Sequence, residues 1–408
     1  MDILLNSNAS SSFNSVVDGV ETNQNPFVYR YAQNVEGTSL SGISRTFQEV
    51  NASNSSSTFG TAVDFHIPKN GLLKNMFVKM KLTKTGSDVC NGAVGALQIS
   101  RISLITSGRI LAEQTGEGLL AKLASQPEDC RENIASMLNL QNTAGNYTSA
   151  TSLLCYVPCL FSCVEALEKC YDTNFVAPLV LRCHVESNSK YIENSSAGAS
   201  SFSALAMSLY CEFIREPAEH QQKRIQADYS DGALQRVQWN EMHEFSDATT
   251  RANAISHEIK SNNYVQEMYI YADAVADVIS NSGIGLKLDT LKIEANGQVI
   301  ADFGNSEDAE LLRRIQDTDP DKWQFCGGSG WDASMGPYNY RYKYNFGLSN
   351  DTRKVYGGVA TRELSNFKVT VKTNDTTASA TRLHVILKYA QLESIESASG
   401  KVTTSISS

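Results

Sequence analysis

The chain has 408 residues, of which 41% are apolar and 19% charged, and its formal net charge is -9 at pH 7. These fractions are ordinary for a globular protein, and a chain of this length suits two or three domains. The acidic balance argues against a protein whose main task is to neutralise nucleic-acid phosphates, so we expect no direct sequence-specific binding of nucleic acid.

The first part of the chain, residues 1–40, is polar, rich in Asn and Ser, and weakly periodic. This composition favours an extended arm that becomes ordered only against a partner. The N-terminal residues lack the basic and apolar regions of a signal peptide. The most apolar stretch, Leu153 to Leu167, is too short to span a membrane. We therefore expect a soluble protein that is not secreted by the classical route.

Strand patterns dominate after the arm. The segment 73–83 alternates apolar with mostly polar side chains, and its apolar positions are Met76, Val78, Met80 and Leu82. The segment 367–372 alternates in the same way, with its lysines on the outward face. A period of two with one buried face is typical of antiparallel sheets that cover a core.

One sequence phrase occurs twice. The first copy, Ile102 to Glu113, reads ISLITSGRILAE, and the second, Leu291 to Asp302, reads LKIEANGQVIAD. In both copies a short apolar hairpin turns at a glycine, and Asn-Gly in particular supplies the positive φ angles of a type I′ turn. The similarity extends to 75–80 with 267–272 and to 204–210 with 381–387, which indicates two related domains.

A short helix is expected after each hairpin. The first candidate is Glu117 to Ala124 and the second is Ser306 to Ile315. In the second candidate Ser306 can cap the N-terminus, and the acidic residues that follow suit its positive end.

The cysteines predict neither a disulfide framework nor a metal site. Nine cysteines in a chain without a secretion signal favour reduced thiols. Their densest cluster is Cys155, Cys159, Cys163 and Cys170, whose spacing matches no familiar zinc site. We expect these side chains to act as small buried apolar groups, with no cofactor and no metal bound.

No catalytic constellation is found, so we expect a protein that is not an enzyme and has no catalytic residues. The histidines, His66, His184, His220, His243, His257 and His384, are scattered, and His66, His184 and His384 fall on expected strands. The pairs His243-Glu244 and His257-Glu258 do not form a His-Glu-x-x-His motif, and we expect each to lie on a solvated helix or turn. The Cys326 to Gly330 run lacks the Lys-Ser/Thr ending of a phosphate loop and is typical of a flexible turn.

An aromatic cluster leaves one alternative open. Aromatic rings can stack on sugars, so the chain could be a jelly-roll carbohydrate-binding or adhesin protein. The cluster consists of Trp323, Phe325, Trp331, Tyr338, Tyr340, Tyr342 and Tyr344. Aromatic residues more often fill a core or an interface.

Together these patterns predict an all-β protein of two tandem eight-stranded jelly rolls, a double jelly roll with short inserted helices. The expected organisation is an N-terminal arm at 1–40, a first jelly roll at 41–218, a second at 219–396 and a C-terminal tail at 397–408.

Several segments resemble the double-jelly-roll major capsid proteins of icosahedral DNA viruses, a lineage that spans tailless phages, polinton-like viruses and nucleocytoplasmic large DNA viruses. The similar segments read YVPCLFS (156–162), VAPLVLRCHV (176–185), LQRVQW (234–239), YNFGLS (344–349) and GVATRELSN (358–366). Cysteines stand at 159 and 163 where that family usually has Leu or Phe, and the loops are short, which points to a smaller member.

The resemblance implies a structural protein of the virion that assembles inside the host cell. Its expected partners are two further copies in a trimeric, pseudo-hexameric capsomer, then neighbouring capsomers, minor capsid, cement and vertex (penton) proteins, and an internal membrane if one lies beneath the shell. The arm would then face inward. The loops at about 141–152, 187–201 and 326–343 are candidates for outer turrets or contacts between subunits.

Overall fold

The computed structural model describes residues 44–53, 58–88, 90–124, 128–140, 146–147, 151–165, 169–192, 200–229, 232–250, 254–274, 286–306, 309, 340–347, 357–373 and 380–406. The expected arm, most of the second expected helix, most of the expected loops at 141–152 and 326–343, and residues 193–199 of the expected loop at 187–201 lie outside these ranges.

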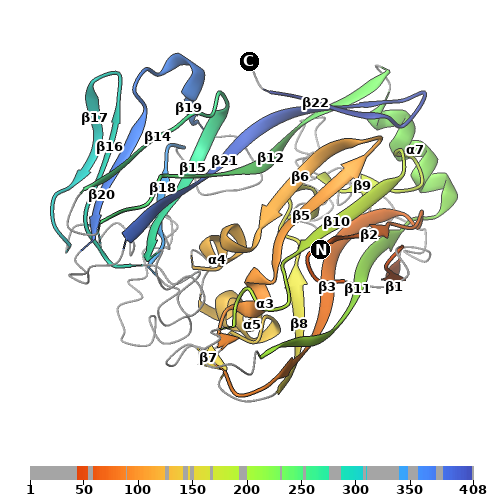
Figure 1. Cartoon of the computed structure of the whole chain (residues 1–408). Coiled ribbons are helices and arrows are strands. Elements are labelled where there is room, and N and C mark those ends of the chain that lie inside the picture. Colours follow the sequence, from red (N-terminus) through yellow and green to blue (C-terminus); the bar gives the residue numbers. More distant parts are fainter. Residues whose placement is uncertain are drawn as a thin grey trace.

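The first half of the chain forms one jelly roll, two facing antiparallel sheets (Figure 1). One sheet has the strand order β1-β11-β3-β8 and the other has the order β2-β10-β5-β6. The strands are β1 (Ser44–Asn51), β2 (Ala62–His66), β3 (Leu72–Thr85), β5 (Ile99–Thr106), β6 (Arg109–Thr115), β8 (Thr151–Pro158), β10 (Leu179–Val185) and β11 (Ser201–Arg215).

The second half repeats this arrangement strand for strand. Its sheets have the orders β12-β21-β15-β18 and β14-β20-β16-β17. The strands are β12 (Ala233–Phe245), β14 (Ile255–Glu258), β15 (Tyr264–Ala274), β16 (Leu288–Ala295), β17 (Gln298–Phe303), β18 (Tyr342–Asn345), β20 (Lys368–Thr373) and β21 (Ala380–Glu396). The expectation of two tandem eight-stranded jelly rolls is confirmed, and we call them roll 1 and roll 2.

Shorter elements decorate the rolls. The helices are α3 (Val94–Leu97), α4 (Gly116–Ala124), α5 (Glu128–Met137), α6 (Ser162–Glu165), α7 (Ala218–Asp228) and the 3-10 turn η5 (Thr361–Glu363). The short strands are β4 (Cys90–Asn91), which pairs with β7 (Asn146–Tyr147), β9 (Tyr171–Asp172), β13 (Thr249–Thr250), β19 (Val359–Ala360) and β22 (Val402–Ile406). The first expected helix is therefore confirmed as α4. Within the described ranges, no helix is long and apolar enough to cross a membrane.

The alternating patterns produce the two cores. Met76, Val78, Met80 and Leu82 of β3 all point into the core of roll 1, because successive side chains of a strand face opposite sides of the sheet. Phe367, Val369 and Val371 point into the core of roll 2, while Lys368 and Lys372 stay half exposed.

The two repeated hairpins turn as expected. Ser107 and Gly108 have φ angles of 47° and 78°, and Asn296 and Gly297 have φ angles of 54° and 74°. Positive φ at both central residues defines a type I′ turn, whose twist matches that of the flanking strands. The hairpins β5–β6 and β16–β17 also share a β-bulge at the same place, after Leu104 and after Ile293.

The two halves are joined by α7 and by the last hairpin of the chain. Strand β22 pairs with the end of β21, within the segment expected to form the tail. Both strands reach over roll 1 (Figure 1), where Ile395 and Val402 are buried in the core of roll 1. The domain boundaries given above stay a prediction.

A glycine in this hairpin lies tightly against roll 1. Gly400 has a φ of 62°, and its carbonyl accepts a 2.8 Å hydrogen bond from the amide of Ala177. A Cβ at Gly400 would lie 2.1 Å from the carbonyl oxygen of Phe175, whereas a Cβ at Gly297 would have open space.

We therefore expect Gly400→Ala to destabilise the protein by about 2 to 4 kcal/mol, because it adds a steric clash to the strain of a positive φ. Gly297→Ala, the matched control, should cost about 1 kcal/mol, the strain alone. Urea unfolding of both variants measures the difference. Equal losses of stability in the two variants would show that the hairpin is not in close contact with roll 1 at Gly400.

Candidate functional site at the junction of the two rolls

The most elaborate arrangement of polar side chains lies where the two rolls meet. Strand β6 and helix α4 of roll 1 face β12 and β21 of roll 2 (Figure 1). Gln391 Nε2 donates to the carbonyl oxygen of Leu111 over 2.6 Å, and the amide of Glu113 donates to Asn240 Oδ1 over 2.8 Å. The edge of roll 1 is thereby hydrogen-bonded by side chains of roll 2.

An ion pair lies beside these hydrogen bonds. Lys122 of α4 pairs with Glu241 of β12, and both side chains are largely buried. Lys122 also donates to the carbonyl oxygen of Leu160 over 2.8 Å. Gly118 makes room for this pair, because a Cβ at that position would lie 2.6 Å from Glu241 Oε2.

Glu393 forms a fully buried centre at the same junction. Its carboxylate accepts hydrogen bonds from the hydroxyl of Tyr171 and from Arg236 Nε, the latter over 2.7 Å. The guanidinium of Arg236 also lies over the Tyr171 ring, 4.7 Å from its centroid. Burial, and then the charge of Glu393, raise the pKa of Tyr171. The hydroxyl therefore remains a donor, and Glu393 is held by both rolls.

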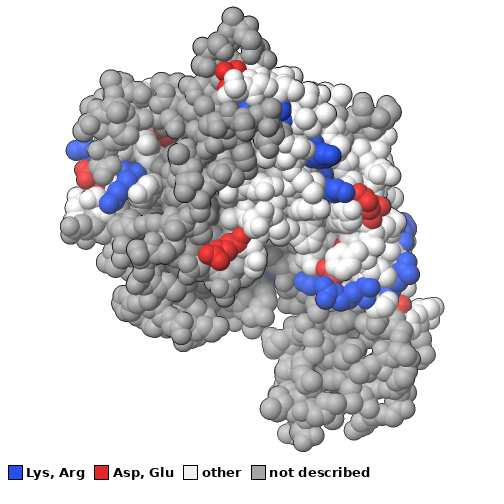
Figure 2. All heavy atoms as spheres, turned by 90° about the horizontal axis from the view of Figure 1, so that it is seen from below, with Lys and Arg blue, Asp and Glu red and all other residues white. Residues whose placement is uncertain are grey.

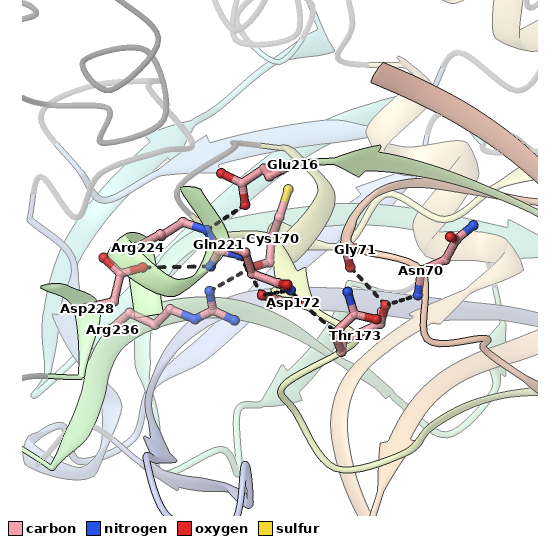
Figure 3. A network of polar contacts seen from close by, with 11 residues as sticks. Asn70, Gly71, Cys170, Asp172, Thr173, Glu216, Gln221, Arg224, Asp228 and Arg236 are labelled. Carbon is pink, nitrogen blue, oxygen red and sulfur yellow. Dashed lines mark hydrogen bonds and ion pairs between the residues drawn. The ribbon is translucent and has the colours of Figure 1, made fainter. Parts of the chain in front are cut away.

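A second polar centre fastens α7, the helix between the rolls (Figure 3). Asp172 accepts hydrogen bonds from Arg224 and from Gln221 Nε2, the latter over 3.0 Å. Arg224 Nε donates to Glu216 over 2.8 Å. Burial alone would lower the pKa of Arg224, but Glu216 and Asp172 outweigh it and raise that pKa. The guanidinium thus stays charged between carboxylates.

The same centre reaches back into both rolls. Thr173 Oγ1 donates to the carbonyl oxygen of Gly71 over 2.8 Å and accepts from the amide of Asn70. Arg236 of β12 donates to the carbonyl oxygen of Cys170 over 3.3 Å. Figure 3 shows these groups converging from roll 1, α7 and β12. Polar contacts therefore hold α7 and the two rolls in one orientation.

Two histidines come together at the other end of the junction. His243 Nε2 lies 3.0 Å from His384 Nδ1, and His384 Nε2 lies 3.1 Å from Asp273 Oδ1. The ring of His384 stacks on that of Tyr271. Burial, and then the neighbouring His384, lower the pKa of His243 to about 3. His243 is therefore neutral at physiological pH.

The histidine cluster is linked to roll 1 through Arg341. Its guanidinium lies over the ring of Tyr271, the residue that stacks on His384, and is 4.6 Å from the ring centroid. It also pairs with Glu117 of α4 over 3.0 Å. The junction thus runs from Asp172 to His243 as a line of buried polar groups.

The expected placement of the His-Glu pairs is wrong. His243 and Glu244 lie on β12, and His257 and Glu258 lie on β14, so neither pair is on a helix or turn. His257 Nε2 instead contacts Glu244 Oε2 across the sheets at 2.9 Å. His66, His184 and His384 lie on strands, as expected.

A cleft of about 370 Å³ opens next to Glu244. It is lined by Met242, Glu244, Lys260, Asn263, Tyr389 and Thr404, among others. The carboxylate of Glu244 already accepts from His257 and from the amide of Lys260. Its pKa is lowered, since these hydrogen bonds outweigh burial.

The four clustered cysteines are buried, three of them in the core of roll 1. Cys155, Cys159 and Cys163 are buried there, and Cys170 is buried beside Leu72 and Ile214. Burial raises the pKa of Cys155 to about 11, so this thiol is protonated. In the described part of the chain, no three His, Cys, Asp or Glu side chains are arranged to hold a metal.

The aromatic residues considered for sugar stacking do not form an exposed platform where they are described. Tyr342 is fully buried, and its hydroxyl accepts from the amide of Leu288 over 3.0 Å. Tyr340 and Tyr344 pack against the core of roll 2. Trp323, Phe325, Trp331 and Tyr338 lie outside the described residues, as does the Cys326 to Gly330 run.

Solved structures share this arrangement over almost the whole chain. PBCV-1 VP54, in a crystal structure fitted into a reconstruction of the virophage Sputnik, is 16% identical with a TM-score of 0.68, and the match covers 90% of this chain and 98% of that one. The Faustovirus major capsid protein is 11% identical with a TM-score of 0.60, covering 86% and 90%. The mavirus major capsid protein is 12% identical with a TM-score of 0.55, covering 97% and 96%.

These likenesses show a common fold. The expected resemblance to double-jelly-roll capsid proteins is thus confirmed in the architecture. No protein-family model matches the sequence, and no curated protein sequence matches it.

Proposed function

We propose that the protein is the major capsid protein of an icosahedral DNA virus and is located in the virion shell. One observation carries the proposal: two complete jelly rolls of equal strand order lie in one chain, as in major capsid proteins that match over nearly their full length. The role is structural, and the buried polar junction serves to hold two building blocks in one orientation.

The proposed assembly is a homotrimer. Three chains carry six rolls, which together form a pseudo-hexameric capsomer that tiles a shell with its neighbours. A closed ring of identical chains uses a heterologous interface, with different surfaces of each chain in contact. Obligate interfaces of this kind bury about 2,000 Å² or more. Minor capsid, cement and vertex proteins, and an internal membrane where the virus has one, are the further proposed partners.

The surface charge is compatible with contacts between proteins. On the face shown in Figure 2, small groups of basic and acidic side chains alternate with uncharged surface. The formal charge of -9 also favours protein partners over direct binding to the genome.

Native mass spectrometry of the purified full chain tests this proposal. We expect one dominant species at three times 44.6 kDa, about 134 kDa. Electron microscopy of the same sample should show particles with a hexagonal outline. A protein that stays monomeric at every accessible concentration would overturn the proposal, and a glycan-binding screen would then be the next experiment.

A further inference from the structure

A small polar cavity lies beside the ion pair of Lys122 and Glu241, and we call it the junction cavity. Its volume is about 10 Å³. A cavity of this size is just large enough for one water molecule. Both rolls contribute to its wall, roll 1 with Glu113, Lys122, Leu160, Phe161 and Ser162, and roll 2 with Trp239, Asn240, Glu241 and Lys388. The cavity is therefore part of the contact that joins the rolls.

Trp239 brings a hydrogen-bond donor to the junction cavity. The residue is only 4% exposed, and its Nε1–H has no hydrogen-bond partner among the described residues. The face of its ring is covered by the ammonium group of Lys388, which is 5.4 Å from the ring centroid. Because buried polar groups are almost always hydrogen-bonded, an indole N–H in this position indicates a partner that is not a side chain or carbonyl of the described chain.

Glu241 brings an acceptor to the same cavity. Oε1 of its carboxylate lies against the ammonium group of Lys122 in the ion pair. The second oxygen, Oε2, is buried and accepts no hydrogen bond from the described residues. A carboxylate oxygen out of contact with water is costly unless a donor reaches it, so this atom also indicates a further partner.

Ser162 brings a second donor, from the first residue of α6 in roll 1. It is 3% exposed, and its Oγ accepts a hydrogen bond from Nζ of Lys169 over 3.4 Å. A serine hydroxyl that accepts still has one proton to donate. The wall of the cavity thus carries two donors, Trp239 and Ser162, and one acceptor, Glu241.

This combination of groups selects the chemistry of the occupant. A monatomic anion would accept from Trp239 and Ser162, but the carboxylate of Glu241 would repel it. A monatomic cation would suit Glu241, but the ammonium groups of Lys122 and Lys388 line the same cavity and would repel it. A water molecule accepts from both donors and donates to the carboxylate. Buried waters typically make about three hydrogen bonds, which is the number offered here.

We propose that the junction cavity binds one ordered water molecule, which bridges Trp239 Nε1, Ser162 Oγ and Glu241 Oε2. Because Ser162 belongs to roll 1 and the other two residues belong to roll 2, the water forms part of the contact between the rolls. It also completes the hydrogen bonding of the carboxylate that pairs with Lys122. This inference concerns the single chain and does not depend on the proposed trimer.

A crystal or electron-microscopy map of the full chain, at a resolution that shows ordered waters, tests the site directly. We expect one peak at about 2.7 to 3.2 Å from each of the three atoms. The peak should lose most of its strength in Trp239→Phe, which removes the indole donor and keeps an aromatic ring beside Lys388. It should persist in Ser208→Ala, a control that removes a buried hydroxyl bonded to Glu49 and outside the cavity.

Two results would overturn the inference. The first is a map that defines the surrounding side chains and other ordered waters but shows no peak in the cavity. The second is a peak that gives an anomalous signal after a bromide soak, which would mark an anion site. If Trp239→Phe does not fold, as judged by circular dichroism, Ser162→Ala removes the other donor and takes its place.

A double-mutant cycle gives an independent measurement in solution. Trp239 Nε1 does not hydrogen-bond directly to Ser162, so a coupling between the two groups would be carried by the shared water. We expect Trp239→Phe with Ser162→Ala to lose less stability in urea unfolding than the sum of the two single losses. Trp239→Phe with Ser208→Ala, the control pair, should be additive. Additive losses in both pairs would contradict a water that bridges Trp239 and Ser162.

Discussion

Removal of the Glu393 carboxylate should destabilise the protein by about 3 to 5 kcal/mol, because it leaves a buried guanidinium without its counter-charge. We expect Glu393→Ala to show this loss in chemical unfolding. Arg236 is held over Tyr171 and has only a small exposed fraction, so it cannot turn freely into solvent. Its pKa is raised, since the charge of Glu393 outweighs the opposing effect of burial.

The double variant Glu393→Leu with Arg236→Met is the control. Replacing both charges by apolar groups of similar size removes the uncompensated charge, so most of the stability should return. Calorimetry should also show whether the two rolls still unfold together, because Glu393 joins them through Tyr171. A loss below about 1 kcal/mol for Glu393→Ala would mean that the pair behaves as an exposed salt bridge does.

The protein should lose stability as the pH falls from about 6.5 towards 4, and His243 should account for much of the loss. The folded state holds the pKa of His243 at about 3, below the ordinary value of 6.5. Between these two pKa values the unfolded chain therefore binds one more proton than the folded chain. The contribution of His243 to the free energy of unfolding is fully present only above the unfolded pKa and is lost as the pH falls. A difference of one bound proton between the two states gives the free energy of unfolding a slope of about 1.4 kcal/mol per pH unit.

The physical cause is the crowding of His243 at the junction. A proton on its ring would be placed beside His384 in a largely buried position, with Arg341 nearby and Asp273 as the favourable charge among the described residues. Charging this cluster should therefore weaken the contact between the rolls at the end where Arg341 pairs with Glu117.

His243→Gln should flatten the stability curve between pH 6.5 and 5, above the range in which carboxylates titrate. His66→Gln is the matched control, because His66 lies exposed at the end of β2 in roll 1. Urea unfolding at several pH values measures both. An unchanged slope in His243→Gln would contradict the assignment.

The sequence alone predicted the repeating parts of this protein. The alternation of Met76, Val78, Met80 and Leu82, and the Asn296-Gly297 turn, depend on local rules: side chains of a strand alternate, and positive φ favours Asn and Gly. The repeated hairpin then indicated two rolls, because similar local patterns in the same order build similar sheets.

The junction could not be predicted in this way. Glu393 and His384 lie on β21 among apolar neighbours. A polar residue within such a run indicates that it has a buried hydrogen-bond partner, but the sequence does not show which residue that partner is. The partners Tyr171 and His243 are 222 and 141 positions away in the chain. The two histidines therefore looked scattered, and the expectation of a helix or turn at His243 was wrong.

The sequence by itself determined that the chain forms two all-β units of one design, because periodicity and turn chemistry are local. Only the tertiary structure decided how the units face one another and which polar groups are buried between them. Those features depend on contacts between side chains from distant strands. Side chains become buried, and their pKa values shift, only when these tertiary contacts form.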